Sequence, residues 1–127
     1  MSITFRIHHI QDGLAYGQLS WPEKGLQTGA FSGPYGRHEL PLGLYYAYRS
    51  KLLDKNGEQG YCDSLNNCWM QVLDPQFSTD RNNLGIHPDG NKVGTLGCIG
   101  LLDADTSPWF NAFYSLASGD HVMVEVI

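Results

Sequence analysis

The stretch that decides the fold class is ITFRIHHIQDGLAYGQLSW, residues 3–21. Residues 3–7 alternate weakly between apolar and polar side chains, and residues 14–21 have the pattern of a partner strand. Between the two runs stands Asp12-Gly13, a pair that accepts the positive φ angles of a two-residue hairpin turn. We therefore expect the chain to begin with an antiparallel β-hairpin.

The pattern continues along the chain as short apolar segments separated by glycine and proline, which number 15 and 6. This distribution is typical of an antiparallel β protein. We expect further strands at 27–32, 44–48, 68–73, 83–87 and 121–127, and turns at 54–57, 74–75 and 88–91.

One helix is expected after residue 98. Thr106 or Ser107 is a suitable N-cap, and Pro108 lies near the first helical position. Gly119 is expected to end the helix. The apolar residues between them follow a helical period: Trp109, Phe110, Phe113, Leu116 and Ala117.

The chain of 127 residues fits one domain, residues 1–127. A hydrophobic content of 42% predicts a globular protein, and the net charge of −5 argues against nucleic acid as a partner. No apolar run is long enough to cross a membrane, and the start of the chain lacks the pattern of a secretory signal. We expect synthesis in the cytoplasm, so that any action outside it requires another export route.

Cys62 and Cys68 lie close enough in sequence for a hairpin or tight loop to join them. Two interpretations stay open, a disulfide bond or two reduced, half-buried thiols, because the missing signal argues for a reducing compartment at synthesis. Two cysteines without a second close pair fall short of the four ligands of a zinc site, so we expect no metal and no cofactor.

Cys98 is the remaining cysteine, and it stands in the segment GTLGCIGL, residues 94–101, with His87 eleven positions upstream. A thiol becomes a nucleophile with an adjacent base, and His87 is the best candidate for that base. Free cysteine is more commonly a small buried hydrophobe. Gly97 and Gly100 favour the nucleophile, since they leave room for a substrate carbonyl and for backbone N–H groups directed at an oxyanion.

The other charged candidates are weaker. Arg37 is a candidate ligand for a substrate carboxylate, although a solvated arginine is the commoner case. Asp103 and Asp105 are expected in the turn before the helix, where carboxylates interact well with its N-terminal dipole. The remaining histidines are expected at the surface: His8, His9, His38 and His121.

The segment from Ile86-His87 to Thr95-Leu96-Gly97-Cys98-Ile99-Gly100-Leu101 resembles the signature of the L,D-transpeptidase (YkuD-type) catalytic domain. The stretch LPLGLY, residues 40–45, resembles the Thr-Pro-x-Gly-x-Tyr/Phe strand of that family. The closing helix and strand also follow the family, so the resemblance covers roughly residues 31–127. Leu96 replaces the second histidine of the signature, Gly100 replaces its Arg or Asn, and the spacing from His87 to Cys98 is shorter than usual.

The resemblance implies a mainly β, sandwich or barrel-like fold with one helix after the nucleophile. It implies Cys98 as nucleophile, His87 as base, Gly97 and Thr95 in oxyanion binding or positioning, and Arg37 and Tyr45 in substrate binding. The implied substrate is the stem peptide of peptidoglycan, handled by L,D-transpeptidation, L,D-carboxypeptidation or exchange of a D-amino acid.

Small peptidoglycan-targeting members without a signal peptide include type VI secretion effectors. The resemblance therefore also implies an antibacterial toxin that acts in the periplasm or cell wall, with an immunity protein as partner. Two alternatives stay open. One is a catalytically inactive peptidoglycan-binding module, which Leu96 motivates. The other is a cysteine peptidase or amidase that cleaves a different wall peptide bond.

Overall fold

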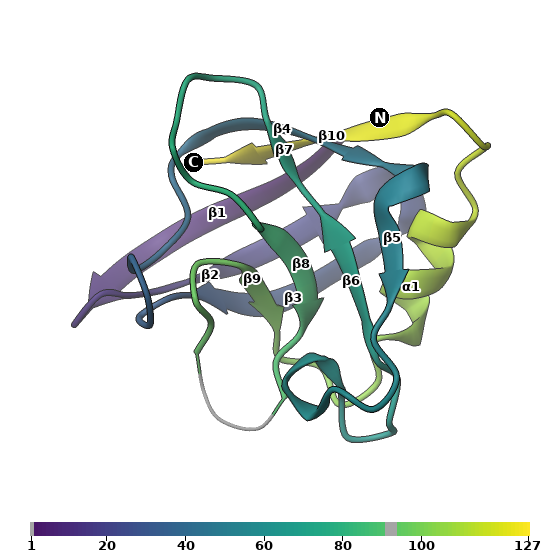
Figure 1. Ribbon diagram of the computed structural model, residues 1–127, viewed down its shortest axis with the longest axis horizontal. Coiled ribbons are helices and arrows are strands. Elements are labelled where there is room, and N and C mark those ends of the chain that lie inside the picture. The colour runs from purple at the N-terminus through teal and green to yellow at the C-terminus, as the bar shows by residue number, and fades with distance from the viewer. Residues whose placement is uncertain (1, 91–93) are drawn as a thin grey trace.

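The computed structural model describes residues 2–90 and 94–127, and Figure 1 shows them. Within these residues, ten strands form one sheet in the order β5-β6-β8-β9-β3-β2-β1-β10-β4-β7. The strands are β1 (Ser2–Gln11), β2 (Leu14–Trp21), β3 (Leu26–Ser32), β4 (Gly43–Tyr48), β5 (Leu52–Asp54), β6 (Trp69–Val72), β7 (Asp74–Pro75), β8 (Gly85–Pro88), β9 (Ile99–Leu101) and β10 (His121–Val126). The helices are α1 (Ser107–Tyr114) and three short 3₁₀ turns, η1 (Pro22–Lys24), η2 (Arg49–Lys51) and η3 (Gln59–Tyr61).

The first hairpin forms as the sequence predicts. Strands β1 and β2 pair antiparallel up to the closing pair Gln11↔Leu14. Asp12 and Gly13 form the turn with φ angles of 54° and 80°, the left-handed region that this dipeptide tolerates. Strand β1 pairs on its other side with β10, in parallel, so the first and last strands of the chain are neighbours in the sheet.

The sheet curls because two strands that are consecutive in the chain, β6 and β7, pair at opposite ends of the strand order. Strand β6 pairs with β5 and β8, whereas β7 pairs with β4 at the far end of the strand order, and only Leu73 separates the two. One residue spans about 3.3 Å, so the two ends of the sheet must lie close together. Gln71 Nε2 joins them by donating to the carbonyl oxygen of Tyr48, at 2.9 Å. The prediction of a mainly β fold is confirmed.

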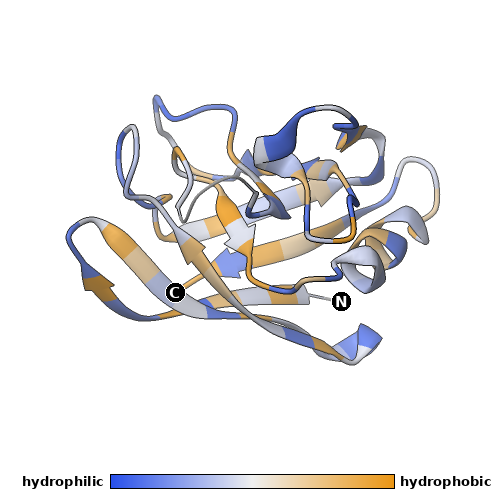
Figure 2. Cartoon of the chain, turned by 90° about the horizontal axis from the view of Figure 1, so that it is seen from below, coloured by the Kyte–Doolittle hydropathy of each residue, from blue (hydrophilic) through white to orange (hydrophobic). Residues whose placement is uncertain are grey.

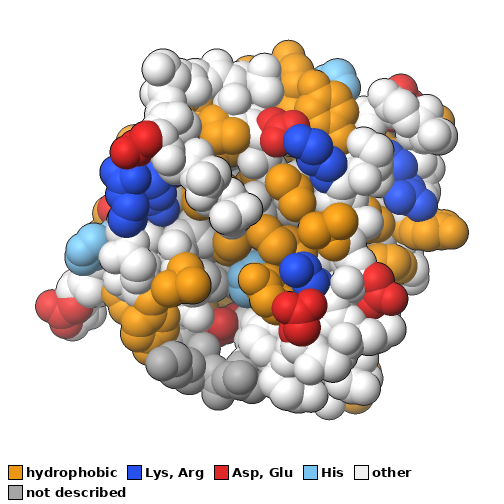
Figure 3. All heavy atoms as spheres, in the orientation of Figure 1, with side chains coloured by type: hydrophobic (Ala, Val, Ile, Leu, Met, Phe, Trp, Pro, Cys, Tyr) orange, Lys and Arg blue, Asp and Glu red, His pale blue; other side chains and the backbone are white. Residues whose placement is uncertain are grey.

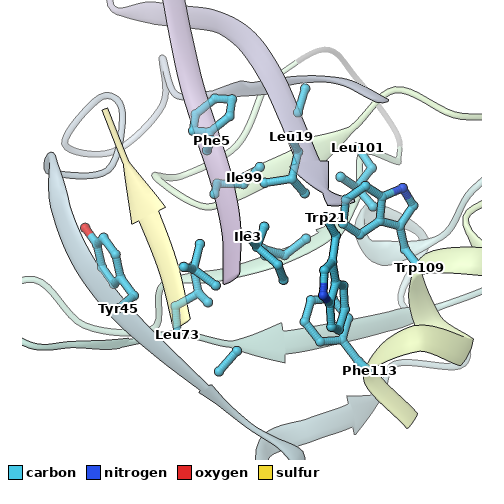
Figure 4. Close-up of a cluster of buried hydrophobic side chains, with 14 of the residues drawn as sticks. Ile3, Phe5, Leu19, Trp21, Tyr45, Leu73, Ile99, Leu101, Trp109 and Phe113 are labelled. Atoms are coloured by element: carbon cyan, nitrogen blue, oxygen red, sulfur yellow. The ribbon is translucent and has the colours of Figure 1, made fainter. Parts of the chain in front are cut away.

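The interior of the curl holds the hydrophobic core, which α1 covers at one end. Figure 4 shows Trp109 and Phe113 projecting from α1 towards Trp21 of β2. The ring of Trp21 lies 5.0 Å from that of Phe113 and 6.4 Å from that of Trp109, between centroids. Hydrophobic residues alternate with polar ones along several strands in Figure 2, as expected for a sheet with one face buried.

The helix is shorter than the sequence predicts, and it begins without the expected cap. Helix α1 ends at Tyr114, before Leu116 and Ala117. Thr106 is the N-cap residue, but its Oγ1 makes no cap hydrogen bond. It donates instead to Asp63 Oδ2, at 2.8 Å, and accepts from Trp69 Nε1, at 2.9 Å. None of the described helices has the length and apolar character needed to cross a membrane.

Two further details differ from the sequence expectations. The sequence predicts a turn at Asp74-Pro75, but these residues pair with β4 as the short strand β7, because the curl brings that strand within reach. The turn expected at 88–91 begins inside β8, and its last residue, Asn91, lies outside the described residues.

A disulfide joins Cys62 and Cys68, with the Cα atoms 4.0 Å apart, which decides between the two interpretations left open. The loop that it closes is also held by the buried carboxylate of Asp63. That carboxylate accepts hydrogen bonds from the backbone N–H groups of Leu65, Asn67 and Thr106, at 3.0, 2.8 and 2.7 Å. The loop is therefore fixed both to itself and to the start of α1.

Replacing Phe113 by alanine tests the role of α1 in closing the core. Phe113 is fully buried, so we expect Phe113→Ala to lower the free energy of unfolding by about 3–5 kcal/mol. The neighbouring Tyr114 is 60% exposed, and Tyr114→Ala is expected to cost about 1 kcal/mol or less. Urea unfolding followed by tryptophan fluorescence measures both. Equal losses in the two variants would contradict this packing of the helix.

Candidate functional site

The candidate site is built on two adjacent parallel strands, β8 and β9. Their register pairs Ile86 with Ile99 and His87 with Gly100. Side chains alternate between the faces of a strand, so Cys98, just before β9, lies on the same face as Gly100 and therefore as His87. Such diagonal neighbours have Cα atoms about 7–8 Å apart, within reach of a long side chain. The sheet thus brings the two predicted residues to one surface.

His87 has the tautomer that a general base requires. Its Nδ1 lies 2.6 Å from the carbonyl oxygen of Pro88. A carbonyl only accepts, so Nδ1 carries the proton and the lone pair of the neutral ring is on Nε2. Burial lowers the pKa of His87, and it outweighs the Pro88 hydrogen bond, which raises that pKa. The imidazole is therefore neutral near pH 7 and free to accept a proton at Nε2.

Cys98 is the free thiol of the described residues, and it is 7% exposed. Its Sγ donates to the carbonyl oxygen of Asn83, at 3.4 Å. Burial raises the pKa of the thiol to about 11, against a backbone hydrogen bond from Gly85 and the positive charges of Arg81 and Lys55, which lower it. Across residues 2–90 and 94–127, no hydrogen bond joins Cys98 to His87. The resting pair is thus a neutral thiol beside a neutral imidazole.

Thr95 holds the turn that presents Cys98. Its Oγ1 donates to the carbonyl oxygen of Cys98, at 2.6 Å, and accepts from the N–H groups of Gly33 and Gly97, at 3.1 and 3.2 Å. These bonds fix the turn, and the positioning role that the resemblance implies for Thr95 in the reaction stays a prediction. The same bonds engage the N–H of Gly97, which the sequence assigns to an oxyanion, so that group is not directed at a substrate.

Gly97 makes room for an arginine. Its φ of 122° lies in the region that favours glycine. A Cβ at this position would overlap Nη2 of Arg81, so the space that the sequence assigns to a substrate carbonyl is filled by a guanidinium. Arg81 Nη1 donates to the carbonyl oxygen of Glu39, at 3.2 Å.

Cys98 and His87 open onto one cleft of about 1110 Å³, large enough for a peptide segment. Hydrophobic side chains gather in the centre of this face in Figure 3, over the place of β6 and β8 in Figure 1, with charged groups around them. The lining comprises Tyr35, Leu53, Lys55, Gly60, Tyr61, Met70, Val72, Leu73, Asp74, Pro75, Arg81, Asn82, Asn83, His87, Asp89, Gly94, Thr95, Leu96 and Cys98.

Two further groups line the same cleft. The ring of Tyr61 lies 4.7 Å from the ring of His87, between centroids, and covers it. Asp89 is half-buried, and burial raises the pKa of its carboxyl to about 6, against a hydrogen bond from the N–H of Gly94 that lowers it. A carboxyl of this pKa changes charge near pH 6.

The structure does not bring every predicted site residue into the cleft. Tyr45 is fully buried in the core, where its hydroxyl donates to the carbonyl oxygen of Pro41, at 2.6 Å. Its assignment to substrate binding is corrected by that burial. Arg37 lies outside the cleft lining and forms an exposed ion pair with Asp80, at 2.8 Å, so its assignment to substrate binding stays a prediction. The other four histidines are exposed: His8, His9, His38 and His121.

Sequence reasoning missed Arg81, Asp89, Lys55 and Tyr61. Asp89 stands in a Pro-Asp-Gly sequence, which predicts a turn. Arg81 follows Ser78-Thr79-Asp80 in a stretch without any motif. Nothing in the sequence marks either as part of this cleft, because Asp89 reaches it through the pairing of β8 with β9 and Arg81 through the packing of its loop against Gly97.

A second hollow, of about 600 Å³, lies between β5 and α1. Among its described lining residues there is no histidine, and the cysteine there, Cys68, is bonded to Cys62. Within the described residues, no group of three His, Cys, Asp or Glu side chains is arranged to hold a metal ion. Of the two hollows, the cleft at Cys98 is therefore the one whose described lining contains both a free thiol and a histidine.

Comparison with known protein families, with curated proteins and with solved structures finds no match for this chain.

The raised pKa of Cys98 predicts a characteristic pH profile of alkylation. Only the thiolate reacts, so the rate with iodoacetamide should rise about tenfold per pH unit and still be rising at pH 9.5. Intact-mass spectrometry measures the rate, and Cys98→Ser is the control that locates the label. A rate that levels off near pH 9, the range of an ordinary thiol, would contradict the burial of this sulfur.

Proposed function

We propose that this protein is a cysteine acyl-transfer enzyme that acts on the stem peptides of peptidoglycan, of the L,D-transpeptidase or L,D-carboxypeptidase type. The observation that carries the proposal is the placement of Cys98 and His87 on one face of two adjacent strands, opening onto a single cleft. The resemblance around Cys98 supplies the substrate class.

In the proposed reaction, the sulfur of Cys98 attacks the carbonyl carbon of the third stem residue. The thiol proton passes to His87 Nε2, which is free because Nδ1 is held by Pro88. The tetrahedral intermediate collapses, the C–N bond to the terminal D-alanine breaks, and His87 returns the proton to the leaving amine. A thioester remains on Cys98.

An acceptor then resolves the thioester. An amine gives transpeptidation or exchange of the D-amino acid, and water gives carboxypeptidation. The neutral resting state of both groups fits this sequence of steps. Burying two uncharged groups avoids the desolvation cost of an ion, and charge develops only when the sulfur attacks the substrate carbonyl. Tyr61 limits the access of water to His87 by covering its ring.

The disulfide supports an oxidising site of action. A bond between Cys62 and Cys68 persists in compartments such as the periplasm, where peptidoglycan lies. We propose that the protein acts there after delivery by a secretion system, as an antibacterial effector with a dedicated immunity protein.

A second candidate is a wall-binding module without activity. The high pKa of the Cys98 thiol and the replacement of the second signature histidine by Leu96 favour it. A binding module would hold peptidoglycan while leaving its peptides intact. A cysteine amidase that cleaves a different wall peptide bond uses the same pair, and only the products distinguish it.

The deciding experiment incubates the protein with disaccharide tetrapeptides and follows the products by mass spectrometry. We expect loss or exchange of the terminal D-alanine. Cys98→Ala should abolish turnover, and His87→Gln should lower it by about 10²–10⁴-fold. His121→Gln, a change to an exposed histidine on β10, should leave it unchanged.

Each result has a distinct meaning. Wild-type turnover in the Cys98→Ala variant would exclude this mechanism. Cleavage at the sugar–peptide amide would favour the amidase. Intact peptides together with retention on sedimented peptidoglycan would favour the binding module.

A further inference from the structure

Arg81 is the least explained charged group in the cleft. Its Nη2 is buried and has no hydrogen-bond partner among the residues that the structure describes. In the same part of the chain, no ion pair engages its guanidinium. A buried N–H of a cation without an acceptor is costly, so its retention calls for a reason beyond packing.

The position of the guanidinium suggests that reason. Nη1 is held by the carbonyl oxygens of Glu39 and Arg37, at 3.2 and 3.5 Å, which fixes the plane of the group. Nη2 then occupies the space where Gly97 would carry a side chain, next to Cys98 in sequence. The same loop accepts the thiol proton, through the carbonyl oxygen of Asn83. The loop 81–83 thus supplies both an acceptor for the thiol and a positive charge at the neighbouring Gly97.

The other charged side chains of the cleft either form ion pairs or are carboxyl groups, which cannot supply a positive charge. Lys55 lies 3.8 Å from the carboxylate of Glu58, and its Nζ lies over the ring of Tyr61. Asp74 is paired with Lys51, at 2.9 Å. Asp89 carries no positive charge in either protonation state. Arg81 is therefore a cation of the cleft that forms no ion pair with a carboxylate among the described residues.

We propose that Arg81 is a positioning residue that sets the charge state of the Cys98 site. Its fixed guanidinium stabilises the negative charge that forms on the sulfur, and on the acyl group attached to it, during transfer. This role rests on the proposed function of Cys98 as a nucleophile. It also accounts for Gly97, because any side chain there would displace the guanidinium.

The test measures the thiol without any peptidoglycan substrate. At pH 9 the rate of alkylation of Cys98 by iodoacetamide follows the thiolate fraction. Removing a nearby positive charge raises the pKa of a thiol by about one unit or more, so Arg81→Gln should lower the rate about tenfold. Arg81→Lys keeps the charge and should stay within about threefold of the wild type. Arg6→Gln, the same change at an exposed site on β1, should have no effect.

Thermal unfolding accompanies each rate, and Arg81→Met, which keeps the apolar stem, replaces the glutamine variant if that variant does not fold. An unchanged rate in a folded Arg81→Gln variant would overturn the proposal. Equal losses in the glutamine and lysine variants would also overturn it, since they would assign Arg81 to hydrogen bonding alone. Turnover of tetrapeptides tests Cys98 separately, so a failure of the proposed function and a failure of Arg81 give different results.

Discussion

The parallel pairing of β8 with β9 is the constraint on which the site depends. It sets His87 opposite Gly100 and leaves Cys98 on the same face, one diagonal step away. Thr95 secures this arrangement, because its hydroxyl bonds to both sides of the turn that ends at Cys98. A slip of one residue in this register would turn one of the two side chains into the core.

Burial gives the site its electrostatic character. It lowers the pKa of His87 and raises that of Cys98, so both groups rest uncharged. A cleft of this kind avoids the cost of an unpaired ion in the interior, but it needs positive charge close by when a thiolate develops. Arg81 meets that need, and the glycine at 97 gives it the space.

One wall of the cleft lies next to the loop closed by the disulfide. Tyr61, immediately before Cys62, packs on the ring of His87. Asp63, immediately after it, ties the loop to the backbone of Thr106 at the start of α1. His87 is therefore linked, through one short segment, to the helix that also closes the core.

The sequence by itself determined the local features: the Asp12-Gly13 hairpin, the strand pattern of a mainly β chain, a helix after Cys98, and Cys98 with His87 as the chemically distinctive pair. Such features depend on side chains near one another in the chain, where turn geometry and periodicity act directly. Only the tertiary structure decided which strands are neighbours. Tertiary packing brought Arg81 against Gly97, the residue before Cys98, and it placed Tyr45 in the core, because long-range pairing and burial depend on the whole sheet and not on any short stretch of residues.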